Sequence, residues 1–406
     1  MKDILMYRIK NDIVAASCVA SILFLAIVSL GLSLAVLPLF VSKYLEYSPF
    51  YIGLVVAAES IATLASRAYA GRYSDRNGPK KGMVFGLSLT IIAGLMVFIV
   101  FYLDNPGVFS YIIIILSRLI MGGGESLIFT CSGTWPIGLV GREHAGKIMS
   151  WVGIAMFLGL AIGNYAGIWS YYNIGIMLSA FFMTILPVLG FIIVMIVRPV
   201  IFHPESNQPT LFFAVKRIWK AGSGFSLANI GYASVTTFLV LYFIESGWSV
   251  YSAFALSLFG IGYVLSRLTL GWKADSCGLK MTLFSLAIEA SGLLLIAISS
   301  HAYIAMAGSF LTGFGLSMVY PLLALPALKS MPEENIGLAL STYESCFDIG
   351  ILLAGLIGGT IVSIFGYSGI YFFSFLCCIL ASFSTVMAYR QLKHTGRMVN
   401  HQAALE

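Results

Sequence analysis

Long apolar runs separated by short polar loops recur along the whole chain. Most runs reach about 20 residues, the length that an α-helix needs to cross a bilayer core of about 30 Å. We therefore expect an all-α membrane protein with twelve transmembrane helices. The expected spans are 13–41, 50–72, 83–102, 108–131, 147–168, 174–197, 223–244, 251–272, 281–300, 303–326, 337–363 and 368–390.

One polar pattern occurs twice, two hundred residues apart. The stretch 67–81 returns as 267–280, each time where an apolar run ends and a basic loop begins. The repeat predicts two pseudo-symmetric six-helix halves with equivalent loops on one side of the membrane. We expect an N-terminal half at 1–197, a cytoplasmic linker at 198–222, a C-terminal half at 223–390 and a cytoplasmic tail at 391–406.

Basic residues follow the same alternation. If the N-terminus is cytoplasmic, nearly all loop lysines and arginines fall on the cytoplasmic side, and the opposite face keeps only Lys43. This asymmetry accounts for the net charge of +6 in a chain with 59% hydrophobic residues. We expect a bacterial inner-membrane protein with both termini in the cytoplasm and no nucleic-acid partner.

The residues that usually carry catalysis or bind metals are scattered. Six cysteines and five histidines show no metal-ligand spacing. No Ser/His/Asp constellation falls at one membrane depth. We expect no metal, no cofactor and no enzymatic activity.

The linker carries an amphipathic pattern. Its aromatic and aliphatic residues interleave with basic ones, which suits a short helix on the anionic leaflet; partner binding is the alternative. The residues are Phe212, Phe213, Ile218 and Trp219 with Lys216, Arg217 and Lys220.

The first loop resembles a known family motif. Its pattern is Gly71-x-x-x-Asp75-Arg76-x-Gly78-x-Lys80-Lys81. Together with the twelve-helix layout, it resembles the motif between helices 2 and 3 of major facilitator transporters. The resemblance implies alternating access, with the loop latching a cytoplasmic gate and its aspartate facing the start of helix 11. A degenerate copy contains Asp275. The alternative is that the loop only anchors topology through its charges.

Two helices carry further resemblances. The stretch from Arg118 to Glu125 resembles the buried-arginine motif of helix 4 in that superfamily. Helix 5 resembles the antiporter motif of drug-efflux members, but an asparagine stands where proline is expected, so ordinary helix packing is an open alternative. Its residues are Gly159, Gly163, Asn164 and Gly167.

Nearly the whole chain looks like a bacterial branch often labelled arabinose-efflux-permease-like. The resemblance lies in the stretch 124–127, in 313–321 and in Phe347-Asp348. Members are thought to export small molecules, and related facilitators move metal-chelating metabolites such as siderophores.

Ionisable residues inside the expected spans are the strongest functional candidates, because each costs about 2.5–3.5 kcal/mol at a helix centre. Arg118 and Glu125 lie seven residues apart and Glu344 and Asp348 four apart, so each pair shares a helix face. Close carboxylates at low dielectric favour proton binding. The proton-coupling candidates are Glu125, Asp348, Glu344 and Glu59. In the alternative, Glu125 only neutralises Arg118.

Other buried polar residues suggest a binding cavity. Arg118 suits an anionic substrate, and further candidates lie near mid-span on helices that line the cavity in the superfamily. They are Ser33, Tyr232, Thr236, Tyr320 and Tyr343. Glu289, on the span 281–300, and Arg67 and Arg267, beside the loop motifs, are ionisable but less direct candidates.

These patterns favour a secondary transporter that exports a small organic molecule, drug-like, sugar-like or metal-chelating, against proton entry. Its partners would be the substrate, protons and lipid, and by analogy with the superfamily it would be a monomer. Proton-coupled import of a small organic or anionic solute is the first alternative. A non-transporting membrane sensor is the second.

Overall fold

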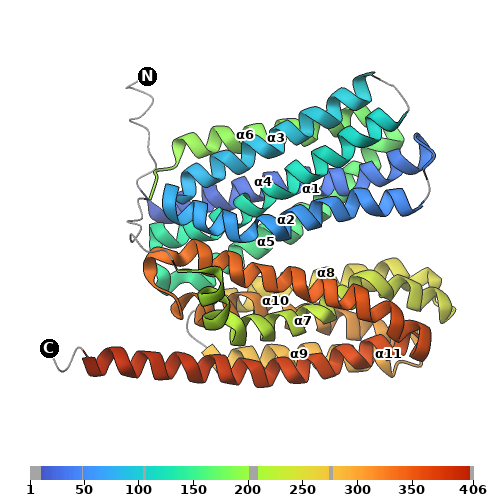
Figure 1. Cartoon of the computed structure of the whole chain (residues 1–406). Helices are drawn as coiled ribbons and strands as arrows, with labels where there is room; N and C mark the ends of the chain where they lie inside the picture. Colours follow the sequence, from blue (N-terminus) through green and yellow to red (C-terminus); the bar gives the residue numbers. More distant parts are fainter. Residues whose placement is uncertain (1–10, 48, 104–106, 201–208, 274–277, 403–406) are drawn as a thin grey trace, which may run out of the picture. The chain divides into compact units, whose positions relative to one another are not determined.

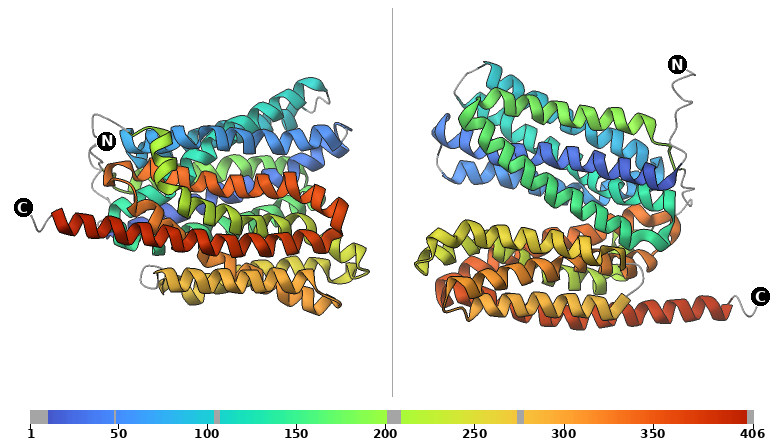
Figure 2. Two further views of the ribbon diagram at one scale, coloured as in Figure 1. Left: turned by 60° about the horizontal axis from the view of Figure 1, so that its bottom comes forward. Right: turned by 180° about the vertical axis from the view of Figure 1, so that it is seen from behind.

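A computed structural model describes residues 11–47, 49–103, 107–200, 209–273 and 278–402, and within them the regular structure is helical. Figure 1 and Figure 2 show the helices in each part of the chain running side by side. The α-helices are α1 (Asp12–Lys43), α2 (Pro49–Asn77), α3 (Pro79–Leu103), α4 (Val108–Val140), α5 (Ala145–Asn173), α6 (Ile176–Ile196), α7 (Leu211–Glu245), α8 (Ser252–Leu270), α9 (Gly278–Ala297), α10 (Ala302–Lys329) and α11 (Ile336–Gln402). Short 3₁₀ turns join them at η2 (Arg142–His144), η3 (Ser249–Tyr251), η4 (Gly271–Lys273) and η5 (Glu333–Asn335).

The longest element, α11, consists of two helices. Gly366 has φ +70°, a left-handed conformation that side-chain-bearing residues rarely adopt, and it interrupts the helical backbone. The orange and red portions of α11 fold back on each other (Figure 1). Ten stretches of the described residues are long and apolar enough to span a membrane, one of them running through both portions of α11. The all-helical membrane fold predicted from the sequence is confirmed.

The chain forms two compact units that exchange short segments. Unit 1 contains residues 1–142, 151–208 and 334–341, and unit 2 contains 143–150, 209–333 and 342–406. The first turns of α5 therefore belong to unit 2, and those of α11 belong to unit 1.

Close helix contacts in unit 1 depend on missing side chains. A Cβ on Gly122 of α4 would lie 2.4 Å from the backbone oxygen of Glu59 in α2, and one on Gly86 of α3 would lie 2.8 Å from that of Gly124. Only glycine permits such approaches without displacement of a backbone. The contacts hold α2 and α3 against α4.

In unit 2, α10 is the central helix, because 83% of its most apolar stretch is buried inside the protein. A Cβ on Gly313 would lie 2.1 Å from the backbone oxygen of Phe259 in α8, and one on Gly315 would lie 2.4 Å from the amide nitrogen of Glu289 in α9. The two glycines, close together on α10, bring α8 and α9 against this helix.

Helix α7 begins at Leu211, well before the start at residue 223 expected from hydropathy. The Thr210 hydroxyl caps it by accepting a hydrogen bond from the Phe213 amide at 3.3 Å. Lys216, Arg217 and Lys220 lie before the expected apolar span but within the helix, because a helix tolerates lysine and arginine well.

Candidate transport site

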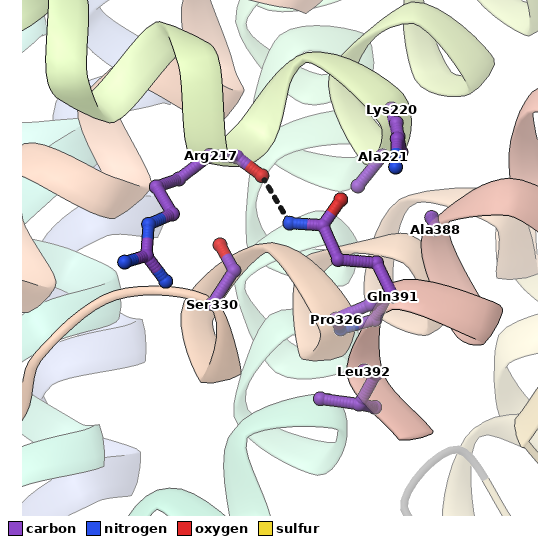
Figure 3. A pocket seen from close by; sticks show the side chains of 8 residues that line it. All are labelled: Arg217, Lys220, Ala221, Pro326, Ser330, Ala388, Gln391 and Leu392. Carbon is purple, nitrogen blue, oxygen red and sulfur yellow. Dashed lines mark hydrogen bonds between the residues drawn. The ribbon is translucent and has the colours of Figure 1, made fainter. Parts of the chain in front are cut away.

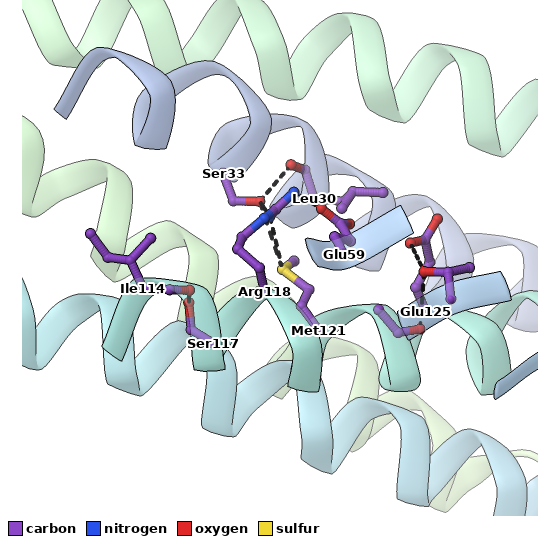
Figure 4. A network of polar contacts seen from close by, with 10 residues as sticks. Leu30, Ser33, Glu59, Ile114, Ser117, Arg118, Met121 and Glu125 are labelled. Carbon is purple, nitrogen blue, oxygen red and sulfur yellow. Dashed lines mark hydrogen bonds and ion pairs between the residues drawn. The ribbon is translucent and has the colours of Figure 1, made fainter. Parts of the chain in front are cut away.

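A charged cluster lies inside unit 1, where three helices meet (Figure 4). Arg118 of α4 forms an ion pair with Glu59 of α2, and the two residues are only 1% and 4% exposed. Arg118 also donates to the Ser33 hydroxyl of α1 at 2.5 Å and approaches the Met121 sulfur at 3.6 Å. Two predicted substrate residues, Arg118 and Ser33, are therefore in direct contact, and the acid that pairs with the arginine is Glu59.

Glu125, two turns further along α4, is half-buried and faces α2 through Thr63. The Thr63 hydroxyl lies 3.0 Å from Glu125 Oε2 and 3.2 Å from the Gly122 carbonyl oxygen. A hydroxyl has one hydrogen to donate and two acceptor lone pairs. With Glu125 ionised, Thr63 donates to the carboxylate. With Glu125 protonated, Thr63 donates to Gly122 and accepts from the acid.

Unit 2 brings together three of the predicted aromatic residues. Tyr320 of α10 and Tyr343 of α11 have ring centroids 5.8 Å apart, and Phe225 of α7 stacks on Tyr343 at 4.7 Å. The ring of Tyr232 belongs to the same cluster, because its centroid lies 5.7 Å from that of Phe347, which in turn stacks on Phe225 at 6.0 Å. The Tyr343 hydroxyl donates to the Tyr320 carbonyl oxygen at 2.9 Å, which fixes the ring.

Both predicted acids of α11 belong to unit 2. Glu344 is buried, and the Tyr320 hydroxyl lies 3.5 Å from its Oε1. Asp348 is partly exposed one turn later. Thr236 of α7 is exposed, and its hydroxyl bonds to the Tyr232 carbonyl oxygen of its own helix at 3.0 Å.

The first loop motif meets the beginning of α11 within unit 1. Asp75 accepts hydrogen bonds from the amides of Gly337 at 2.6 Å and Leu338 at 2.8 Å. These are orphan donors at the positive end of a helix. Burial raises the pKa of Asp75, beyond the end of the expected span, to about 7, and the two amide donors oppose this shift. A Cβ on Gly71 would lie 2.6 Å from the Gly337 carbonyl oxygen, so the motif glycine permits the contact.

The other motif residues turn the chain and secure the turn. Gly78 has φ +85° between α2 and α3. The Lys80 ammonium donates to the Val197 carbonyl oxygen at 2.6 Å, at the negative end of α6. Arg76 and Lys81 are exposed and line an open groove with Lys80. Asp275, predicted in the second copy, lies outside the described residues.

Arg267, the ionisable residue beside the second loop motif, is buried in unit 2. It is 2% exposed and donates to the carbonyl oxygens of Met149 at 2.8 Å and Ser150 at 2.9 Å, in the first turns of α5. It also donates to the Tyr263 hydroxyl at 2.8 Å. In unit 2, an arginine bonded to carbonyls thus holds a segment of α5, as Asp75 holds one of α11 in unit 1.

The helix 5 motif packs against α1 within unit 1. A Cβ on Gly163 would lie 2.4 Å from the Val28 carbonyl oxygen, and Gly159 and Gly167 also face α1. Asn164, at the position where proline was expected, is exposed. These contacts show close helix packing by the glycines of the motif.

A small basic pocket lies at the beginning of α7 (Figure 3). The Gln391 amide donates to the Arg217 carbonyl oxygen at 3.3 Å across it. Its lining combines two basic, two polar and four apolar residues and contains no acidic side chain: Arg217, Lys220, Ser330, Gln391, Ala221, Pro326, Ala388 and Leu392. Among the described residues, no group of three or more His, Cys, Asp or Glu side chains is arranged to hold a metal ion.

Long apolar helices in two compact units that exchange short segments are typical of a polytopic membrane transporter. The family model of the Major Facilitator Superfamily matches residues 19–278 and 252–404. The chain belongs to this superfamily and is a transporter, not an enzyme.

Related sequences and structures agree with this assignment. The chain is 35% identical to the uncharacterised MFS-type transporter YhhS of Escherichia coli over 351 residues, covering 86% of each chain. It is 30% identical over 380 residues to one from Salmonella typhimurium, covering 92% of this chain and 96% of the relative. The human organic anion transporter MFSD10 has a TM-score of 0.79 at 13% identity, covering 93% of this chain and 100% of the other. The E. coli fucose:proton symporter FucP has 0.78 at 15%, covering 93% and 99%. At these identities the structures show the fold alone.

Proposed function

We propose that this protein couples proton entry to the export of a small organic molecule by alternating access. The observation that carries the proton coupling is the contact between Glu125 and Thr63. The distances from the Thr63 hydroxyl to Glu125 and to Gly122, 3.0 and 3.2 Å, satisfy the carboxyl in both its ionised and its protonated form. A proton can therefore bind and leave without a buried polar group losing its partner.

In this proposal, Arg118 of the neighbouring ion pair binds the substrate. Arg118 is held by Glu59 and Ser33 inside the bundle. A substrate with a carboxylate or phosphate would compete with Glu59 for its forked donors. The proposal therefore favours an anionic or metal-chelating organic solute.

The gate loop is proposed to control access. Asp75 holds the beginning of α11, a helix whose remainder belongs to unit 2. Release of this contact would free the beginning of α11. The distribution of basic residues favours an orientation in a bacterial inner membrane with both termini on the cytoplasmic side. The exposed Phe212 and Trp219 at the beginning of α7 would lie against its anionic leaflet.

The experiment has two stages. Comparison of metabolites in cells with and without the protein identifies the solute: accumulation in deficient cells indicates export, and lost uptake indicates import. Purified protein in vesicles is then given that solute with and without an imposed pH gradient.

For Glu125→Gln we expect the stimulation by the gradient to fall about 10-fold or more, within the range of typical coupling free energies. Glutamine keeps the size of the side chain but cannot release a proton. Glu143→Gln, in the loop before α5, is the control and should behave as wild type. If the wild-type protein moves the solute equally well without a gradient, proton coupling is wrong.

A further inference from the structure

A second buried acid lies in unit 2, apart from the aromatic cluster. Glu289 is in the middle of α9, and its side chain is 0% exposed. Neither carboxyl oxygen has a nitrogen or oxygen hydrogen-bond partner among the described residues. Its polar neighbour is the thiol of Cys378 in the second portion of α11.

The surrounding helices leave space for this carboxyl. A Cβ on Gly231 of α7 would lie 2.8 Å from Glu289 Oε1, and one on Gly315 of α10 would lie 2.4 Å from its amide nitrogen. α7 thus presents a glycine to the carboxyl, Gly315 lets α10 approach the backbone of α9, and α11 presents a titratable thiol. Among the described residues, no cationic side chain acts on the Glu289 carboxyl.

An ionised carboxylate in such a place is costly, because its side chain is buried and no cationic side chain among the described residues offsets its charge. The neutral acid removes most of this cost and can donate weakly to sulfur. We propose that Glu289 is a proton-binding site that carries a proton in this buried arrangement and releases it when its carboxyl becomes accessible to water. The inference rests on the proposed proton-coupled transport and adds a second site, in the other unit.

The first test needs no substrate. Infrared spectra of the full-length protein in lipid vesicles at neutral pH should contain carbonyl absorption of protonated carboxylic acids, part of it from Asp75 with its pKa of about 7. Glu289→Gln should lack one component of this band. Glu245→Gln removes an exposed acid at the end of α7 and should leave the band unchanged. A band that is missing in the wild type, or unaltered in Glu289→Gln, would overturn the proposal.

The second test asks whether the proton moves. When vesicles are shifted to alkaline pH, wild-type protein should release about one proton more than Glu289→Gln, since one carboxylic acid holds one proton. Equal release by the two proteins would show a structural acid only. Glu289→Asp keeps the acid if glutamine disturbs folding, and it should release that proton.

The third test separates this inference from the proposed function. In the vesicle assay, the response to the pH gradient should fall about 10-fold or more in Glu289→Gln. If the wild type responds and Glu289→Gln responds equally, Glu289 is not a coupling site and the proposed function stands. If the wild type does not respond, the proposed function itself fails.

Discussion

Arg118 contacts two other helices from a position that water does not reach. It pairs with Glu59 on α2 and donates to Ser33 on α1. The sequence showed that Arg118 and Glu125 share a face of α4, because spacing within one helix follows from its period. It could not show that Glu59 would be the ion-pair partner, since that depends on how α2 packs on α4 through Gly122.

Removal of one charge of this ion pair should destabilise the protein more than removal of both charges. Glu59→Gln leaves the Arg118 charge buried without its counter-charge and should destabilise the protein by about 3–5 kcal/mol. The double variant Glu59→Gln with Arg118→Met removes both charges and should recover most of this loss. Thermal unfolding in lipid measures both variants. A double variant as unstable as Glu59→Gln alone would contradict the role of the buried charge.

Asp75 gives a pH dependence with a definite sign. Its pKa is raised by burial from 3.8 to about 7, so the buried arrangement favours the neutral acid. The stability that this adds is present below pH 3.8 and is lost as the pH rises toward about 7. Asparagine is neutral at every pH, so Asp75→Asn should not lose stability as the pH rises through this range. Melting temperatures of the two proteins across this range should diverge from each other, and parallel curves would refute the assignment.

Between elements, the contact of α2 with the beginning of α11 depends on Gly71. An alanine Cβ there would lie 2.6 Å from the Gly337 carbonyl oxygen, a backbone atom. Gly71→Ala should therefore destabilise the protein by about 1–3 kcal/mol, the usual cost of overpacking. Gly355→Ala, in the first portion of α11, meets nothing within 4 Å and is the matched control. Denaturation in lipid should place the control at or above the wild type, since alanine favours helices by about 1 kcal/mol. Equal stability of the two variants would show that α2 and α11 do not need the glycine.

Element boundaries show what a sequence can and cannot predict. The apolar spans gave the helices, because hydropathy reports membrane depth directly. α7 nonetheless begins at Leu211, since helix propensity continues where hydropathy ends. The repeated loop gave the place of Asp75, whereas the carbonyl partners of Arg267 lie on a distant helix that no local pattern specifies.

At the scale of the whole molecule, two units use opposite chemistry to hold equivalent segments. Unit 1 offers a carboxylate to backbone amides at the beginning of α11, and unit 2 offers a guanidinium to backbone carbonyls in the first turns of α5. The two loop copies also differ in sequence, because Ser276 stands where the first copy has Arg76.

The exchange of segments also orders the assembly of the protein during synthesis. Unit 1 contains residues 334–341, which the ribosome adds only after α7 to α10. Until then Asp75 and Gly71 lack the helix end that they contact in the folded protein, and unit 1 lacks this segment. Unit 2, in contrast, receives residues 143–150 before any of its own helices exist. Asp75 is thus without its backbone donors during most of translation. Synthesis of the beginning of α11 then completes the unit that was made first.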